Sequence, residues 1–337
     1  MKGNYSIMTD KTIIDRVIYE EPQIIAPPSP GGIEESVGNT PLIALRRLTG
    51  ELSPQVSVYA KAEWFNPGGS IKDRPALNII RTALAEGALT LGKHLLDASS
   101  GNTGIAYATF GAAMDIPVTL VLPANASPER IAILRALGAE LILSDPEDGI
   151  DGAIRKVGQL LEHDPERYFH ANQYDNPANW QAHYLSTGPE IVQQTHGNVT
   201  HFVAGMGTAG TVTGVGRYLR RYNPAIQIIG GQPASPMHGI EGIKHMATSI
   251  RPAIYDADFP DQMMEVTTEQ AAAMVRRLAR QEGLFVGVSS GANAHLALSV
   301  ARQLQEGVVV TVFPDAGYKY LSQEELWGLE CKQVERE

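Results

Sequence analysis

The sequence predicts an α/β fold of two domains, each with a mostly parallel, twisted sheet flanked by helices. Its 337 residues suffice for about two domains at roughly 100–200 residues each. Apolar runs typical of strands alternate with segments that repeat apolar residues at helical spacing. Nearly continuous apolar strands between helices are typical of parallel sheets covered on both faces. A content of 43% hydrophobic and 19% charged residues excludes a disordered or collagen-like chain.

Apolar runs along the chain are expected to form strands, and periodic segments between them are expected to form helices. The expected strands are 56–62, 94–98, 118–123, 139–144, 201–206, 226–231 and 308–313. The expected helices include 74–85, 128–137, 271–280 and 292–304. The stretch P-P-S-P-G-G at 27–32 has the composition of a linker.

Charge and cysteine content exclude several classes of protein. Lys and Arg number 27 against 37 Asp and Glu, and a net charge of −10 lacks the basic surface of a nucleic-acid binder. The single cysteine, Cys331, excludes an internal disulfide and favours a reducing compartment. Nine histidines without H-x-x-x-H spacing predict no metal site. No run approaches the ~20 apolar residues of a membrane span, and the first residues lack a signal-peptide core, so we expect a cytoplasmic protein without a membrane partner.

A glycine-rich loop, G-M-G-T-A-G at 205–210, follows an expected strand and opens an expected helix. Backbone N–H groups at such a helix start can hold an anion. A dinucleotide site would also need an acidic residue at the end of the next strand, and Gln232 stands there. The loop therefore predicts a phosphate site and not a dinucleotide site, with glycines that merely form a tight turn as the simpler alternative.

Two other motif matches fail on their context. G-V-S-S-G at 287–291 matches a nucleophile elbow, and Asp315 could serve as the acid, but the last histidine, His295, precedes it. The simpler alternative is that Ser290 caps the following helix. G-A-L-T-L-G-K-H at 87–94 has histidine where a Walker A loop needs Ser or Thr for magnesium. The sequence predicts neither a serine hydrolase nor a P-loop enzyme.

A phosphate loop without a ribose-binding acid suggests pyridoxal phosphate, which needs a lysine for its aldehyde and a partner for its ring nitrogen. Lys72 lies in the glycine-rich turn N-P-G-G-S-I-K-D-R at 66–74, where a following helix start would lower the pKa of the amine. The segment D-A-S-S-G-N-T-G-I at 97–105 offers hydroxyl and N–H groups for a carboxylate, with Asn102 beside them. The simpler alternatives are a solvated surface lysine and an N-cap cluster.

These residues resemble those of the cysteine synthase family (O-acetylserine sulfhydrylases), most closely the B-type isozyme. The family consists of pyridoxal-phosphate enzymes with the tryptophan-synthase-β fold, also called fold type II. The matching segments run in the family's order over residues 38–322. They are G-N-T-P-L (38–42), N-P-G-G-S-I-K-D-R (66–74), S-S-G-N-T-G (99–104), Q-Y-D-N-P-A-N (173–179), T-G-P-E-I (187–191), G-M-G-T-A-G-T (205–211), G-V-S-S-G-A (287–292) and K-Y-L-S (319–322).

The resemblance implies a domain division and a role for each matching residue. An N-terminal arm (1–37) would precede a smaller, substrate-binding α/β domain (38–180), which is interwoven with a cofactor-binding α/β domain (181–325) and followed by a tail (326–337). Lys72 would bond the cofactor and act as acid and base at the substrate α-carbon, Asn102 would bind the phenolic oxygen, and Ser290 would face the ring nitrogen. The phosphate would be held by Gly207, Thr208, Ala209, Gly210 and Thr211. The substrate α-carboxylate would be held by Ser99, Ser100, Thr103 and Gln173.

The reaction implied by the resemblance is a β-replacement that forms L-cysteine through an aminoacrylate. The donor is an activated serine, either O-acetylserine or O-phosphoserine, and the sulfur comes from sulfide, thiosulfate, or a carrier persulfide or thiocarboxylate. Lys244, in the loop H-G-I-E-G-I-K-H-M at 238–246, is hypothesised to favour an anionic donor, with a solvated lysine as the alternative. Other β-replacement enzymes (cystathionine β-synthase-like or diaminopropionate-forming) and a silent, partner-binding scaffold stay open. A homodimer is expected by resemblance only.

Overall fold

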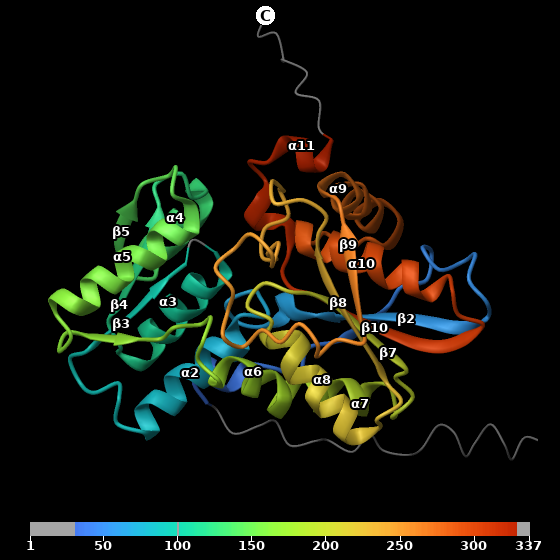
Figure 1. Cartoon of the computed structure of the whole chain (residues 1–337), viewed down its shortest axis with the longest axis horizontal. Coiled ribbons are helices and arrows are strands. Elements are labelled where there is room, and N and C mark those ends of the chain that lie inside the picture. Colours follow the sequence, from blue (N-terminus) through green and yellow to red (C-terminus); the bar gives the residue numbers. More distant parts are fainter. Residues whose placement is uncertain (1–30, 100, 329–337) are drawn as a thin grey trace, which may run out of the picture. The chain divides into compact units, whose positions relative to one another are not determined.

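Two mainly parallel sheets organise the chain (Figure 1), as expected from the sequence. The computed structural model describes residues 31–99 and 101–328. The described residues from Ile33 onward belong to one compact unit. The predicted linker and arm lie mostly outside the described residues, and so does Ser100.

The larger sheet has the strand order β1-β2-β10-β7-β8-β9. Its strands are β1 (Leu42–Ala44), β2 (Gln55–Ala62), β7 (His201–Gly205), β8 (Gln227–Pro233), β9 (Gln262–Val266) and β10 (Glu306–Phe313). β1 pairs with β2 in the antiparallel sense, and the other neighbours are parallel. The pairing of β10 with β2, from Glu306 opposite Gln55 to Phe313 opposite Ala62, brings together two segments that are far apart in the sequence.

The smaller sheet has the order β5-β4-β3-β6, with every pair parallel. Its strands are β3 (His94–Ala98), β4 (Val118–Pro123), β5 (Glu140–Ser144) and β6 (Tyr168–His170). All its strands come from the range 94–170, whereas β1 and β2 precede that range and join the larger sheet.

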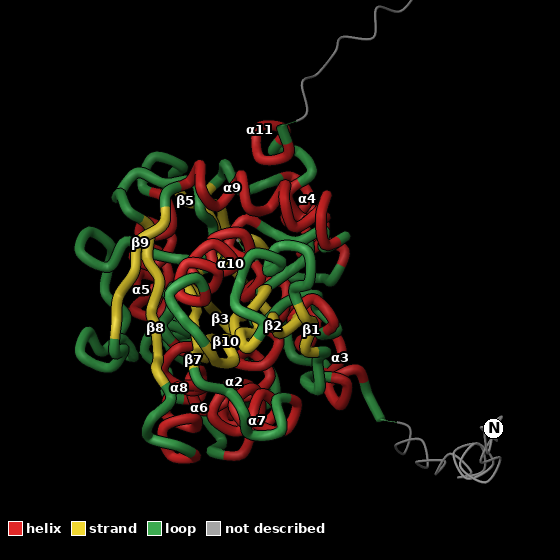
Figure 2. The backbone as a smooth tube through the Cα atoms, turned by 90° about the vertical axis from the view of Figure 1, so that its right-hand side faces the viewer, coloured by secondary structure: helices red, strands yellow, loops and turns green. Residues whose placement is uncertain are grey.

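Helices cover both faces of the larger sheet, with α9 and α10 on one side and α7 and α8 on the other (Figures 1 and 2). The helices are α2 (Asp73–Ala85), α3 (Asn102–Met114), α4 (Pro128–Ala136), α5 (Gly149–His163), α6 (Ala178–Ala182), α7 (Gly188–Gln194), α8 (Gly210–Tyr222), α9 (Thr268–Arg277), α10 (Val288–Ala301) and α11 (Glu324–Trp327). Shorter helical turns are η1 (Ile33–Ser36), η2 (Glu63–Phe65), η3 (His183–Thr187), η4 (Leu278–Glu282) and η5 (Gly317–Tyr320).

Successive side chains of β10 pack alternately against the helices on the two faces of the larger sheet. Val309 and Phe313 are buried in the core with α9 and α10, while Val310 and Val312 are buried in the core with α7 and α8. Successive side chains of a strand point to opposite faces, so a strand buried on both faces is apolar throughout. A third core lies between the smaller sheet, α2 and α3. Among the described residues, no helix combines the length and apolarity that a membrane crossing requires, and no group of side chains suits a metal ion.

Candidate active site

One cavity of about 390 Å³ collects the carboxyl ends of strands from both sheets. The segments that follow β3, β4, β7 and β10 all contribute to its wall, which is where open parallel sheets bind ligands. Every described residue of the predicted site except Ser290 lines this cavity. These residues are Lys72, Ser99, Asn102, Thr103, Gln173, Gly207, Thr208, Ala209, Gly210, Thr211 and Lys244.

Lys72 lies directly before α2, in a turn fixed by backbone hydrogen bonds. Gly69 adopts a φ of +75°, a left-handed conformation suited to glycine, and its N–H donates to the Asn66 carbonyl at 2.8 Å. The N–H of Ile71 donates to the carbonyl of Pro314 at 2.8 Å, which ties the turn to the end of β10. Burial lowers the pKa of Lys72, although the negative charge of Asp315 opposes the shift. A lowered pKa favours the neutral amine that reacts with an aldehyde.

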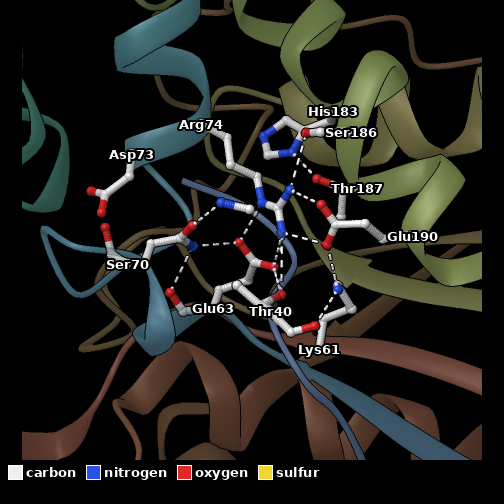
Figure 3. Close-up of polar contacts among 12 residues, drawn as sticks. Thr40, Lys61, Glu63, Ser70, Asp73, Arg74, His183, Ser186, Thr187 and Glu190 are labelled. Carbon is white, nitrogen blue, oxygen red and sulfur yellow. Dashed lines mark hydrogen bonds and ion pairs between the residues drawn. The ribbon is translucent and has the colours of Figure 1, made fainter. Parts of the chain in front are cut away.

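A buried network of charges anchors α2 directly after Lys72 (Figure 3). The Arg74 guanidinium contacts Glu63 at 2.7 Å and Glu190 at 2.6 Å, and Lys61 contacts Glu190 at 2.6 Å. Burial acts to raise the pKa of Glu63, but the paired Arg74 outweighs it, and the pKa falls to about 2. The two cations and two anions balance, and they join β2, η2, α2 and α7 around the lysine turn.

The loop between β7 and α8 has the geometry of an anion site. Ala209 precedes α8 with a φ of +65°, a left-handed conformation that is uncommon outside glycine. The N–H groups of Gly207, Thr208 and Ala209 find no acceptor within the described part of the chain. Unpaired backbone donors at a helix start hold phosphate well. The loop therefore fits the phosphate of a cofactor.

Asn102, the first residue of α3, is held from both ends of its amide. Its Nδ2 donates to Asp315 Oδ2 at 2.7 Å, and its Oδ1 accepts from Lys319 Nζ at 2.7 Å. Asp315 Oδ2 also accepts from the Tyr320 hydroxyl at 2.8 Å. Burial raises the pKa of Asp315, and the hydrogen bond from Asn102 partly opposes this. The amide lies at the cavity wall, within reach of a ligand there.

The predicted carboxylate-binding residues come from two loops that are bonded together. Thr103 Oγ1 donates to Gln173 Oε1 at 2.7 Å, and Gln173 Nε2 donates to the Ala98 carbonyl at 3.2 Å. Ser99 Oγ accepts from the Gly104 N–H at 3.0 Å. Asp97 accepts from the Gln173 N–H at 3.2 Å, and burial raises the pKa of Asp97 to about 7. These bonds hold hydroxyl and amide groups along one side of the cavity.

The structure turns Ser289, and not the predicted Ser290, toward the cavity. Ser290 is fully buried in α10, and its hydroxyl finds no partner in the described residues. Ser289 lines the cavity instead. Adjacent helical residues point about 100° apart, so only one serine of the pair can face the cavity. The sequence could not distinguish the two serines, because both carry a hydroxyl and the choice depends on how α10 is rotated about its axis.

Lys244 lines the cavity beside an aromatic ring. Its Nζ lies 4.3 Å from the centroid of Tyr174 and donates to the Ile250 carbonyl at 3.3 Å. Burial lowers the pKa of Lys244, and Asp151 opposes the shift. The loop thus places the Lys244 side chain at the cavity.

Several side chains around the cavity were not predicted from the sequence. Arg130 lines the cavity, pairs with Glu241 and lies 5.1 Å over the ring of Tyr320. Lys319 and Asp315, which hold Asn102, were missed as well. Lys319 belongs to the segment K-Y-L-S, which matches the family, and this match was the sequence feature that could have pointed to it.

Comparison with known proteins gives consistent matches. The family described as "Pyridoxal-phosphate dependent enzyme" matches residues 33–315. Cysteine synthase of Aquifex aeolicus is 53% identical over 291 residues, which cover 85% of this chain and 89% of that protein. Cysteine synthase B of Pseudomonas aeruginosa is 46% identical over 292 residues, covering 86% and 95%. The crystal structure of cysteine synthase from Entamoeba histolytica matches with a TM-score of 0.86 at 34% identity, covering 92% and 95%.

The two sheets and the cavity between their strand ends define a pyridoxal-phosphate enzyme of fold type II. The chain belongs to the family of pyridoxal-phosphate dependent enzymes, and pyridoxal 5'-phosphate is its cofactor. The resemblance to cysteine synthases is confirmed.

Proposed function

We propose that this enzyme forms L-cysteine by β-replacement, from an activated serine and a sulfur donor. The observation that carries the proposal is one cavity that brings together a lysine with a lowered pKa, a phosphate-type loop and a carboxylate-type loop. The relatives named cysteine synthase support the same reaction. The other β-replacement reactions and the silent scaffold are not favoured by these relatives.

The cofactor supplies an electron sink at the substrate α-carbon. Lys72 would bond it and move the α-proton. The N–H groups of 207–211 would hold its phosphate, Asn102 its phenolic oxygen, and the Ser289 hydroxyl its ring nitrogen in place of Ser290. A hydroxyl partner does not force that nitrogen to carry a proton, as a carboxylate would. The weaker electron sink suits elimination at the β-carbon more than transamination.

The substrate would be held by its α-carboxylate and positioned by its leaving group. Ser99, Thr103 and Gln173, together with Ser100 outside the described residues, would bind the carboxylate. Lys244 would favour an anionic leaving group, as in O-phosphoserine, over the acetyl group of O-acetylserine. The sulfur donor would be sulfide, thiosulfate, or a carrier persulfide or thiocarboxylate.

A donor-and-nucleophile panel tests the reaction. Purified enzyme is supplied with O-acetylserine or O-phosphoserine and with sulfide, thiosulfate, homocysteine or ammonia, and the amino-acid product is identified by mass spectrometry. We expect cysteine from at least one serine donor with a sulfur nucleophile. Cystathionine or diaminopropionate as the preferred product would overturn the proposal in favour of another β-replacement.

The enzyme would act as a cytoplasmic homodimer with an arm (1–37), two α/β domains (38–180 and 181–325) and a tail (326–337). Its single cysteine fits a reducing compartment. Its smaller sheet falls entirely within the first proposed domain. Light scattering after size-exclusion chromatography measures the mass, and a monomer at working concentration would contradict the dimer.

A further inference from the structure

Lys319 connects two parts of the cavity that the proposed function uses. It lies in η5, just after β10, and is half-buried. Its Nζ donates to Asn102 Oδ1 at 2.7 Å, and to the carbonyls of Gly68 and Gly69 at 3.3 Å each. One ammonium therefore contacts both the amide at the start of α3 and the turn that carries Lys72.

The neighbours of Asn102 leave its amide only one orientation. A lysine ammonium can only donate, so it must face the amide oxygen. Asp315 Oδ2 already receives the Tyr320 hydroxyl, and it accepts from Asn102 Nδ2 at 2.7 Å. Turning the amide over would place its N–H groups against the ammonium and its oxygen against the carboxylate. The amide is thereby fixed, and one of its two N–H groups is left for another acceptor.

We propose that Lys319 is a positioning residue that acts through Asn102, holding and polarising the amide so that its remaining N–H binds the phenolic oxygen of the cofactor. This inference rests on the proposed role of Asn102. A hydrogen bond made with a charged partner is stronger than a neutral one, and bonds in a chain polarise one another. The ammonium would therefore strengthen the donor that Asn102 offers.

The consequence is visible in the absorbance of the bound cofactor. A donor at the phenolic oxygen stabilises the ionised oxygen, the form that absorbs visible light. Without Lys319, the Asn102 amide loses its charged partner and offers a weaker donor to the phenolic oxygen, which favours the protonated form that absorbs at shorter wavelength. A purely structural role under the glycine turn would not change this ratio.

The test compares Lys319→Met and Lys319→Arg with the wild-type holoenzyme. Lys156→Met serves as control because Lys156 is exposed on α5. For Lys319→Met we expect a smaller visible band, a larger short-wavelength band and about tenfold weaker cofactor binding. Lys319→Arg keeps a cationic donor and is expected to restore most of the visible band. Lys319→Gln replaces Lys319→Met if that variant does not fold.

A double variant separates action through Asn102 from any other route. In an Asn102→Ala background, Lys319→Met is expected to leave the absorbance ratio unchanged, because coupled residues are not additive. The inference is overturned if Lys319→Met lowers the melting temperature but leaves the wild-type spectrum. The inference is also overturned if Lys319→Met still changes the absorbance ratio in the Asn102→Ala background. Failure of the proposed function would give a different result from these two outcomes, because the wild-type enzyme would then form no cysteine.

Discussion

Buried ionisable side chains surround the cavity, and burial shifts the pKa of several of them. Lys72 has a pKa lowered by burial, and Asp315 has one raised by burial. Asp97, behind the carboxylate-binding loops, has a pKa raised to about 7 because it is fully buried. Its two oxygens accept from the N–H groups of Ala98 and Gln173. At the residue scale the chemistry of the cavity therefore depends on desolvation and on a few hydrogen bonds.

Asp97 makes stability depend on pH in a defined direction. Its folded pKa of about 7 exceeds the ordinary value of 3.8, so the folded state binds the proton more tightly. Stability should fall as pH rises from about 4 to about 7, by up to ~1.4 kcal/mol per pH unit from this group. Asp97→Asn should make stability less dependent on pH over this range. The control variant Asp258→Asn, at an exposed position, should leave the pH dependence of stability unchanged. Melting temperatures of the holoenzyme across this range measure the effect, and parallel curves for wild type and Asp97→Asn would contradict it.

Lys244 should influence the choice of serine donor. Its ammonium faces the cavity, and a phosphate leaving group carries more negative charge than acetate. Lys244→Ala should lower kcat/KM for O-phosphoserine about tenfold, a cost of ~1.4 kcal/mol, with a smaller change for O-acetylserine. The exposed Lys156→Ala is the matched control. Equal kcat/KM for O-phosphoserine in wild type and Lys244→Ala would refute the role.

Helix α2 is the element whose placement matters most, because Lys72 lies directly before it. Arg74, in its first turn, pairs with Glu63 on η2 and Glu190 on α7. A neutral set of buried charges is tolerated when every member is paired, but removing one partner leaves an uncompensated charge. The position of the lysine turn therefore depends on side chains from η2, α2 and the distant helix α7.

Arg74→Leu should destabilise the protein by about 3–5 kcal/mol, because Glu63 and Glu190 would lose their shared partner. Arg74→Lys keeps one charge but loses the forked contacts, so it should cost less. Chemical denaturation of the holoenzyme measures both variants. A stability of Arg74→Leu equal to that of wild type would show that the network does not anchor α2.

Most elements were predictable because their local patterns are strong. The expected strand 118–123 coincides with β4, and 94–98 coincides with β3. The short strands β1 and β6 were missed because three residues carry too little periodicity, and β9 (Q-M-M-E-V) lacks a run of β-branched residues. Helix α9 begins at Thr268, before the expected start at 271, because Thr267 and Gln270 form a capping box.

The whole molecule places strand ends of two sheets around one cavity, and the family resemblance led to every described residue of the predicted site that lines it. Contacts that depend on tertiary packing were not predictable. Lys61 and Glu190 are 129 positions apart in the sequence and meet only after folding. The choice between Ser289 and Ser290 depends on how α10 is rotated against the sheet. The sequence therefore predicted the residue types at the site from local motifs. It did not predict side-chain pairs that are far apart in the sequence or the rotation of a helix against the sheet.

The central claim is that Lys72 bonds pyridoxal phosphate and moves the substrate proton in a cysteine-forming reaction. Lys72→Ala, beside the control Lys156→Ala, tests it most directly. We expect the wild type and the control to show visible cofactor absorbance and to form cysteine. Lys72→Ala should show only the spectrum of non-covalently held cofactor and lose at least about 10³-fold in rate. An unchanged spectrum and rate in Lys72→Ala would contradict the account.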